Sequence, residues 1–233
     1  MTSRQRAYQF YLNRGKLEKA AASASQIGFR GASTNYTVLV RSDLNGYSRW
    51  VKDVDIPARV GLLDDFFSHA AVQAHECHGV YYRDEGDCIV TLFSDYFANG
   101  AGFADILRYA KLVSGRTYGV AALSCKTVVA GGDVTYYQKG AESIEGDWSA
   151  EGDPFITAVR IESAIDSDPS IYFLAEQYDA QFVTAAASQS AASGARYFWE
   201  IERRSLQVQG LQATGGWKDF VVYNHIPQGK LQA

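Results

Sequence analysis

Runs of apolar and β-branched residues along the chain predict a set of strands. The clearest run is YTVLVRSDL, residues 36–44, in which the apolar stretch ends in an acid. Further strands are expected over residues 79–83, 88–93, 117–125, 127–137, 195–210 and 217–224, with a strand running into a helix over 170–183. The expected strands are therefore numerous enough to form one sheet.

Helices are predicted where apolar residues recur at helical spacing or follow a helix-start signal. Residues 45–54 begin a helix after a glycine turn, and residues 150–166 combine a Gly-Asp-Pro start with amphipathic spacing. Two more helices are expected over residues 56–78 and 98–113. Hairpins mixed with helices in this order imply an α+β fold, a mixed sheet flanked by helices, rather than an all-parallel wound sheet.

The pattern divides the chain into two parts. Residues 1–34 mix charges with the helix-prone stretch KLEKAAASASQ, which predicts an N-terminal helical extension. Residues 35–233 carry the strands and helices, and they are numerous enough to bury a core of their own. We therefore expect one main domain that begins at Asn35.

Composition excludes several classes of function. Hydrophobic residues make up 47% of the 233 residues and charged residues 21%, which is the balance of a soluble globular protein. The net charge of −4 provides no basic field for a nucleic acid, and no apolar run reaches the roughly 18 residues of a membrane span. The three cysteines are odd in number and lack paired spacing, which favours free thiols and a cytoplasmic location.

Two acids from distant parts of the sequence are expected to meet at one edge of the sheet. Asp43 ends the first strand, and Asp87 follows the charged turn RDEG, residues 83–86, before a buried strand. In a βαββ unit the first strand lies beside the central hairpin, which would bring both carboxylates together. Paired carboxylates suit Mg²⁺ or Mn²⁺, which prefer oxygen ligands. Taken alone, the turn is that of an ordinary solvated hairpin, and Asp43 alone could cap a helix.

Three stretches in order resemble the motifs of the class III nucleotide cyclases, the family of adenylate and guanylate cyclase catalytic domains. VLVRSDLNGYSRW resembles the first metal motif, YYRDEGDCIVTLF the second, and SAEGDPFITAVRIES the third, whose helix carries an alanine and an arginine before an apolar-acid pair. The resemblance covers about residues 35–224. It implies a ferredoxin-like βαββαβ catalytic domain that acts on a nucleoside triphosphate.

The resemblance also implies the roles of the metal and phosphate groups. Asp43 and Asp87, with the backbone carbonyl of Leu44, would hold two Mn²⁺ or Mg²⁺ ions per site. One ion would activate the ribose 3′-hydroxyl for attack on the α-phosphorus, and the other would hold the triphosphate. Backbone amides of the turn at Gly46 and Tyr47 would receive the phosphates.

Arg160 in the third motif would stabilise charge on the pentavalent phosphorus. In this family the arginine comes from the other subunit, so the resemblance implies a homodimer with two active sites at its interface. Without the motifs, Arg160 would be an exposed helical residue paired with Glu162 or Asp166.

The family reads the base at two positions that are Arg83 and Ser149 in this chain. Arginine offers only donors, so Arg83 suits the carbonyl-rich edge of uracil and should prefer UTP to CTP, while guanine O6 keeps GTP open. Alternatively, Arg83 neutralises Asp84 or Glu85 in the turn. A stand-alone cyclase with such a pocket resembles the bacterial Pycsar pyrimidine cyclases. That resemblance implies cyclic UMP made in anti-phage defence and read by a separate effector that binds cyclic nucleotides.

Two departures from the family pattern leave an alternative open. Ile156 stands where the family usually has an asparagine, and Gln209 and Leu211 stand at the expected places of a phosphate-binding lysine, with Lys218 later. The chain could therefore be a catalytically silent nucleotide-binding dimer module, or a cytidylate or guanylate cyclase. Because both metal acids and the arginine are kept, our hypothesis is an active uridylate cyclase.

Overall fold

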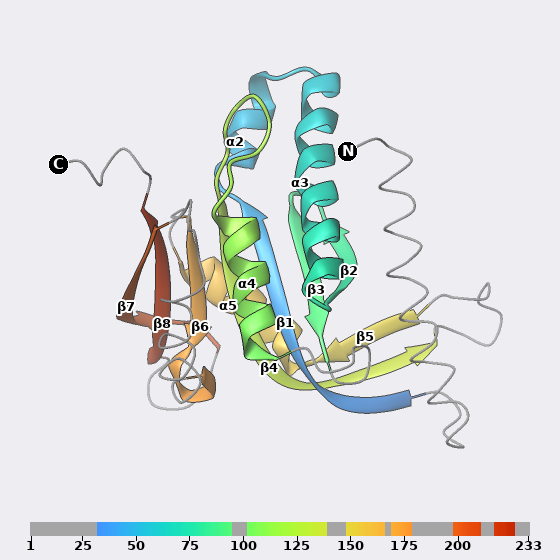
Figure 1. The fold of residues 1–233 in the computed structure, drawn as a ribbon, viewed down its shortest axis with the longest axis vertical. Coiled ribbons are helices and arrows are strands. Elements are labelled where there is room, and N and C mark those ends of the chain that lie inside the picture. The colour runs from blue at the N-terminus through green and yellow to red at the C-terminus, as the bar shows by residue number, and fades with distance from the viewer. Residues whose placement is uncertain are drawn as a thin grey trace.

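The computed structural model describes residues 32–94, 102–138, 148–165, 169–178, 198–210 and 217–226. These residues form one sheet with helices on both of its faces (Figure 1). The predicted N-terminal extension lies outside the described residues, except that residues 32–34 belong to the first strand.

The sheet has eight strands, in the order β2-β3-β1-β4-β6-β8-β7, and β5 pairs with β4. Strand β4 runs parallel to β6, while the other described pairings are antiparallel. The predicted mixed sheet is therefore confirmed. The strands are β1 (Ala32–Leu44), β2 (Val80–Glu85), β3 (Cys88–Phe93), β4 (Cys125–Gln138), β5 (Trp148–Gly152), β6 (Ser170–Leu174), β7 (Phe198–Gln207) and β8 (Trp217–Ile226).

Helices cover both faces of this sheet. They are α2 (Tyr47–Trp50), the short 3₁₀ helix η1 (Val51–Asp53), α3 (Ile56–Glu76), α4 (Phe103–Ser114) and α5 (Asp153–Ala164). Helices α3 and α4 bury residues such as Phe66 and Tyr109 against one face, and α5 buries Ala158 and Ile161 against the other (Figure 1). No helix in the described ranges combines the length and the apolar character that a membrane crossing requires.

The strand predicted over residues 117–125 is wrong. Residues 117–124 form a tight turn in which the backbones of Tyr118 and Leu123 exchange hydrogen bonds of 2.9 and 3.1 Å, and β4 begins only at Cys125. Asp65 on α3 holds this turn by accepting the backbone N–H of Gly119 at 3.2 Å. Within this turn Tyr118 serves packing, because its fully buried ring lies against Phe66 with ring centroids 4.8 Å apart, whereas Val120 is fully exposed.

Helix α5 starts three residues later than predicted, since residues 148–152 form the additional strand β5. Gly152 ends β5 where a side chain has no room, because a Cβ there would lie 2.2 Å from the carbonyl oxygen of Asp133 on β4. Pro154 then occupies the first turn of α5, a position that suits its fixed φ. The short β5 anchors Ser149 to the sheet directly before the helix that carries Arg160.

Candidate active site

Asp43 and Asp87 lie side by side at one end of β1. Strand β1 pairs with β3 so that Asp43 is opposite Cys88, and the backbone N–H of Leu44 donates to the carbonyl oxygen of Asp87 at 3.2 Å. Gly86, with φ 69°, makes the two-residue turn that presents Asp87 beside β1. The two acids that the sequence singled out are thus brought together.

The site concentrates negative charge. Burial is the largest cause that raises the pKa of Asp43 to about 6, the carboxylates of Glu162 and Asp87 also raise it, and Lys126, at 3.4 Å, lowers it. Burial also raises the pKa of Asp87. Two neighbouring carboxylates repel each other when both are ionised, and a bound cation offsets this repulsion.

The donor set fits a hard divalent cation shared with a phosphate. Among the residues that the structure describes, no group of three His, Cys, Asp or Glu side chains is arranged to hold a metal ion. The carboxylates of Asp43 and Asp87 would be side-chain ligands, and substrate oxygens and water would complete the shell. Mg²⁺ is commonly held by one or two carboxylates and substrate phosphates in this way.

Mn²⁺ is expected to stabilise the protein strongly at pH 7.5 and weakly at pH 5. The pKa of Asp43, about 6 in the folded protein, lies above its ordinary value of 3.8, so the folded protein favours the protonated carboxyl between these values. The contribution of Asp43 to the free energy of unfolding is full below pH 3.8 and is lost as the pH rises through 6. At low pH, Mn²⁺ must displace the proton from this carboxyl group in order to bind. Thermal unfolding with and without Mn²⁺ measures the effect. An Mn²⁺ shift that is equal at both pH values, or unchanged in Asp43→Asn, would contradict it.

Gly46 and Tyr47 follow directly at the same end of β1. Gly46 has φ 77°, and its carbonyl accepts the backbone N–H groups of Arg49 and Trp50 at 3.1 and 3.0 Å. The preceding Asn45 is fixed to Ser124 by its backbone N–H and by its side-chain amide. The turn predicted to receive phosphates is therefore held next to Asp43.

A β-bulge places Arg83 on the same face of the sheet as α5. The register between β2 and β3 shifts between Tyr81 and Arg83, so that Tyr82 and Arg83 both reach Phe155 on α5. The Arg83 guanidinium carbon lies 5.2 Å from the centroid of the Tyr82 ring and 5.5 Å from that of Phe155, which is cation–π distance. Arg83 also pairs with Glu85 at 2.5 Å, as in the alternative that gave it a neutralising role.

Ser149 is buried on β5, opposite Tyr137. The next residue, Ala150, donates its backbone N–H to the Tyr82 hydroxyl at 2.8 Å. Tyr82 therefore joins the strand that carries Arg83 to the strand that carries Ser149. The two predicted base-reading positions belong to one corner of the fold.

Arg160 does not join the acids of its own chain in the described structure. It is exposed on α5 and donates to the carbonyl oxygen of Gly210, after β7, whereas Glu162 pairs with Arg41 rather than with Arg160. Lys218, the late candidate for the phosphate lysine, pairs with Glu176 at 3.0 Å. Leu211 lies outside the described residues, and Gln209 is exposed.

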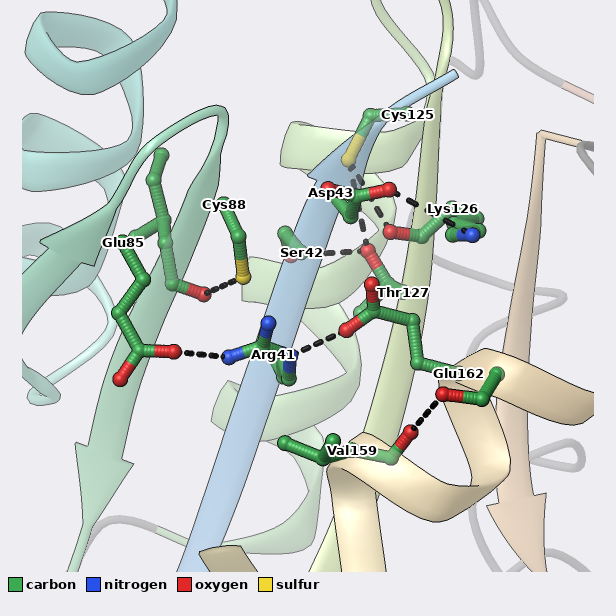
Figure 2. A network of polar contacts seen from close by, with 12 residues as sticks. Arg41, Ser42, Asp43, Glu85, Cys88, Cys125, Lys126, Thr127, Val159 and Glu162 are labelled. Atoms are coloured by element: carbon green, nitrogen blue, oxygen red, sulfur yellow. Dashed lines mark hydrogen bonds and ion pairs between the residues drawn. The ribbon is translucent and has the colours of Figure 1, made fainter. Parts of the chain in front are cut away.

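Sequence reasoning missed several charged residues around the acids. Arg41 lies on the same face of β1 as Asp43 and pairs with Glu85 and Glu162, and Lys126 lies opposite Asp43 on β4 (Figure 2). A signal was available, because Arg41 interrupts an otherwise apolar strand two residues before Asp43, and side chains two apart in a strand share a face. Lys126 likewise stands at the start of the apolar run TVVA.

Comparisons with known proteins identify the fold. No protein-family model and no curated protein matches the chain. The solved adenylyl cyclase CyaB from P. aeruginosa is similar over 84% of this chain and 96% of its own, with 17% identity and a TM-score of 0.59. The guanylyl cyclase Cya2 is similar over 84% and 93%, with 19% identity and a TM-score of 0.57. The guanylate cyclase domain of RhGC from Catenaria anguillulae, solved with GTP, is similar over 84% and 100%, with 13% identity and a TM-score of 0.58. The predicted cyclase catalytic-domain fold is confirmed.

Proposed function

We propose that the protein is a nucleotide cyclase that converts UTP to 3′,5′-cyclic UMP and pyrophosphate. The observation that carries this proposal is the meeting of Asp43 and Asp87 at one end of β1, within a cyclase fold. Both acids stand in stretches that resemble the metal motifs of the cyclases, and Arg160 stands in the third motif. The solved structures compared above are an adenylyl cyclase and guanylyl cyclases.

In the proposed reaction the ribose 3′-hydroxyl loses its proton to solvent water and its oxygen forms a bond to the α-phosphorus, while the bond between the α-phosphorus and the bridging oxygen of the β-phosphate breaks to release pyrophosphate. Two Mn²⁺ or Mg²⁺ ions, when bound, lower the pKa of the 3′-hydroxyl and offset the charge of the leaving group. Asp43, Asp87 and the carbonyl of Leu44 would hold these ions. The turn at Gly46 and Tyr47 would orient the triphosphate through its backbone N–H groups.

A homodimer is supported by the exposed face of α5. Arg160 is flanked there by Ile156 and Val159, which are 53% and 45% exposed although both are large and apolar. An apolar pair beside a functional arginine favours contact with another subunit. The guanylyl cyclase domain of RhoGC, with a similar fold, has been solved as a dimer and as a monomer. In our proposal Arg160 of one subunit stabilises the transition state over the acids of the other.

The preference for uracil is supported by the environment of Arg83. The guanidinium lies against Tyr82 and Phe155 and pairs with Glu85, so its direction is fixed while its side chain stays 45% exposed. A fixed set of donors suits O4 of uracil better than the C4 amine of cytosine. GTP remains the nearest alternative because guanine O6 is also an acceptor.

Arg83→Ala is expected to reduce the ratio of kcat/KM for UTP to that for CTP by about tenfold, since a lost hydrogen bond to the base lowers discrimination by that order. Some turnover should remain, because the metal acids are intact. Arg108→Ala is the matched control, because Arg108 is an exposed arginine on α4, the helix on the opposite face. A UTP to CTP ratio that stays at the wild-type value would leave Arg83 only its role as the partner of Glu85.

The proposed function is tested by incubating the purified protein with each of the four labelled nucleoside triphosphates and Mn²⁺. Cyclic UMP as the main product is the expected result. A main product of cyclic CMP or cyclic GMP would correct the base assignment. No cyclic product from any substrate would overturn the enzyme proposal.

A second candidate is a catalytically silent nucleotide-binding dimer. It is favoured by Ile156 at the position of the family's asparagine and by the pairing of Lys218 with Glu176. Calorimetry that detects UTP binding without cyclic product would support this candidate. We favour the active enzyme because both acids and Arg160 are kept.

The biological role that we propose follows from the resemblance to the Pycsar cyclases. Cyclic UMP would signal phage infection in the cytoplasm and would be read by a separate effector that binds cyclic nucleotides. Phage challenge of cells that express the protein with and without such an effector tests this role. Protection that is independent of Asp43 would contradict it.

A further inference from the structure

Four charged side chains of alternating sign form a row across one face of the sheet. Arg83 pairs with Glu85 (Nη2 to Oε1, 2.5 Å), Arg41 pairs with the other oxygen of Glu85 (Nη1 to Oε2, 2.5 Å), and Arg41 Nε donates to Glu162 on α5. Figure 2 shows Arg41 between the carboxylates of Glu85 and Glu162. These four residues are called the charged row below.

The strand register explains why these residues meet. Arg41 on β1 is opposite Val90 on β3, and Val90 is opposite Arg83 on β2, so the two arginines share a face. This alignment depends on the bulge in β2, because an unbulged strand would turn Arg83 to the face of α3 and α4. The charged row therefore exists only in the bulged register.

The charged row runs beside three groups to which we assign functions, of which Arg160 would act on the acids of the other subunit. The row starts at the base-reading Arg83, and Glu85 lies two residues before the metal acid Asp87. Arg41 lies two residues before Asp43, on the same face of β1. The row ends at Glu162, two residues after Arg160 on α5.

Arg41 is the central residue of the row. Its side chain is only 13% exposed and that of Glu162 only 16%, so the guanidinium is the cation that offsets a largely buried carboxylate. A planar guanidinium can direct Nε and Nη1 to two different carboxylates at once, which a lysine ammonium cannot do in the same fixed geometry. Without the arginine, Glu162 would stand unpaired beside Asp43, and separating these charges would displace α5.

We propose that Arg41 is a positioning residue that holds Arg83 and α5 in fixed places relative to the carboxylates of Asp43 and Asp87. Base selection, and transition-state stabilisation by Arg160 at the acids of the other subunit, then depend on one side chain that touches neither the base nor the phosphate. This inference rests on the proposed function for the roles of Arg83 and Arg160. The link between the hairpin and α5 rests on the geometry alone.

The first test compares Arg41→Met and Arg41→Lys with wild type. Arg41→Met should lower kcat/KM for UTP by about tenfold to 100-fold, as expected for a misplaced catalytic group, and should reduce the UTP to CTP ratio as well. Arg41→Lys should fall between the two, because it can keep one of the two contacts. Arg116→Met is the control, since Arg116 pairs with Asp65 at 2.6 Å on the opposite face and its loss should leave the ratio unchanged.

The second test needs no activity. Arg83→Ala and Glu162→Gln are made singly and together, in the wild-type and in the Arg41→Met background, and the urea midpoint of each is measured. The proposal expects non-additive shifts when Arg41 is present and additive shifts when it is methionine. Additive shifts in both backgrounds would overturn it, as would a wild-type UTP to CTP ratio in folded Arg41→Met.

The two tests separate this inference from the proposed function. If the wild-type protein makes no cyclic nucleotide but the shifts in the urea midpoint are non-additive, the proposed function fails. Arg41 then still couples the β2–β3 hairpin to α5. If cyclic UMP is made while the shifts are additive and the ratio is unchanged, the proposed function stands and the role of Arg41 is refuted.

Discussion

Asp43→Asn is expected to abolish cyclic-nucleotide formation while stabilising the metal-free protein. Asparagine keeps the shape of the side chain but removes an anionic metal ligand, so we expect a loss of at least about 10³-fold in turnover. The pKa of about 6 in the folded protein, against 3.8 ordinarily, means that the ionised carboxylate lowers stability at pH 7.5 by up to about 3 kcal/mol. Asparagine does not ionise, so this loss of stability is avoided. The lost ion pair with Lys126 offsets part of the gain.

Two measurements decide this prediction. Labelled UTP with Mn²⁺ reports turnover, and thermal unfolding in the presence of a chelator reports stability. Asp87→Asn should lose turnover equally. Asp84→Asn is the matched control in the same hairpin, because Asp84 is exposed and bonds only to the Tyr81 hydroxyl, at 3.3 Å, among the contacts described. Full turnover in Asp43→Asn would show that the metal site is elsewhere, and a less stable metal-free variant would contradict the charge argument.

The fold was predictable where hydrophobic pattern and chain order determine it. The apolar stretch in residues 36–44 and the hairpin around Gly86 identified β1, β2 and β3, and their antiparallel pairing follows from the βαββ order. The apolar pattern gave a wrong prediction at residues 117–124, since a turn can bury a side chain such as Tyr118 while Val120 stays exposed. Asp65 of α3 holds this turn through the backbone N–H of Gly119, a tertiary contact that no local pattern reveals.

The positions of the two acids could be predicted from the sequence, but those of the side chains around them could not. Asp43 and Asp87 stand at element ends, where a strand order is enough to bring them together. The neighbours of Arg83 depend on a one-residue bulge, which changes the face of every following side chain in β2 and leaves no mark in the sequence. Helix α5 starts later than predicted because residues 148–152 pair with β4, and the sequence had not predicted this pairing, in which Gly152 lies too close to Asp133 for a side chain.

Arg160 raises a different question, because its partners in the proposed reaction would belong to another copy of the chain. In the described structure the α5 residue that approaches Asp43 is Glu162, while Arg160 is exposed and bonded to Gly210. A single chain therefore cannot reveal the role of Arg160. An experiment that separates the two subunits can.

Mixing Arg160→Ala with Asp43→Asn is expected to restore activity that neither variant has alone. Arg160→Ala should lose about 10²-fold to 10³-fold in turnover, the usual effect of removing one group that stabilises transition-state charge. In a mixed dimer, one of the two sites combines the intact Asp43 of one subunit with the intact Arg160 of the other. With random pairing in a two-fold symmetric dimer, about a quarter of wild-type activity should return.

The control places both substitutions in one chain and mixes it with wild type. If the acids and the arginine come from different subunits, every mixed dimer is inactive, and only the wild-type dimers, about a quarter of the total, contribute. If they come from the same subunit, mixed dimers keep one active site, and about half of the activity remains. Failure of the first mixture to recover, with half the activity kept in the second, would refute a shared site. Full activity in Arg160→Ala alone would reduce Arg160 to an exposed helical residue that caps the carbonyl of Gly210.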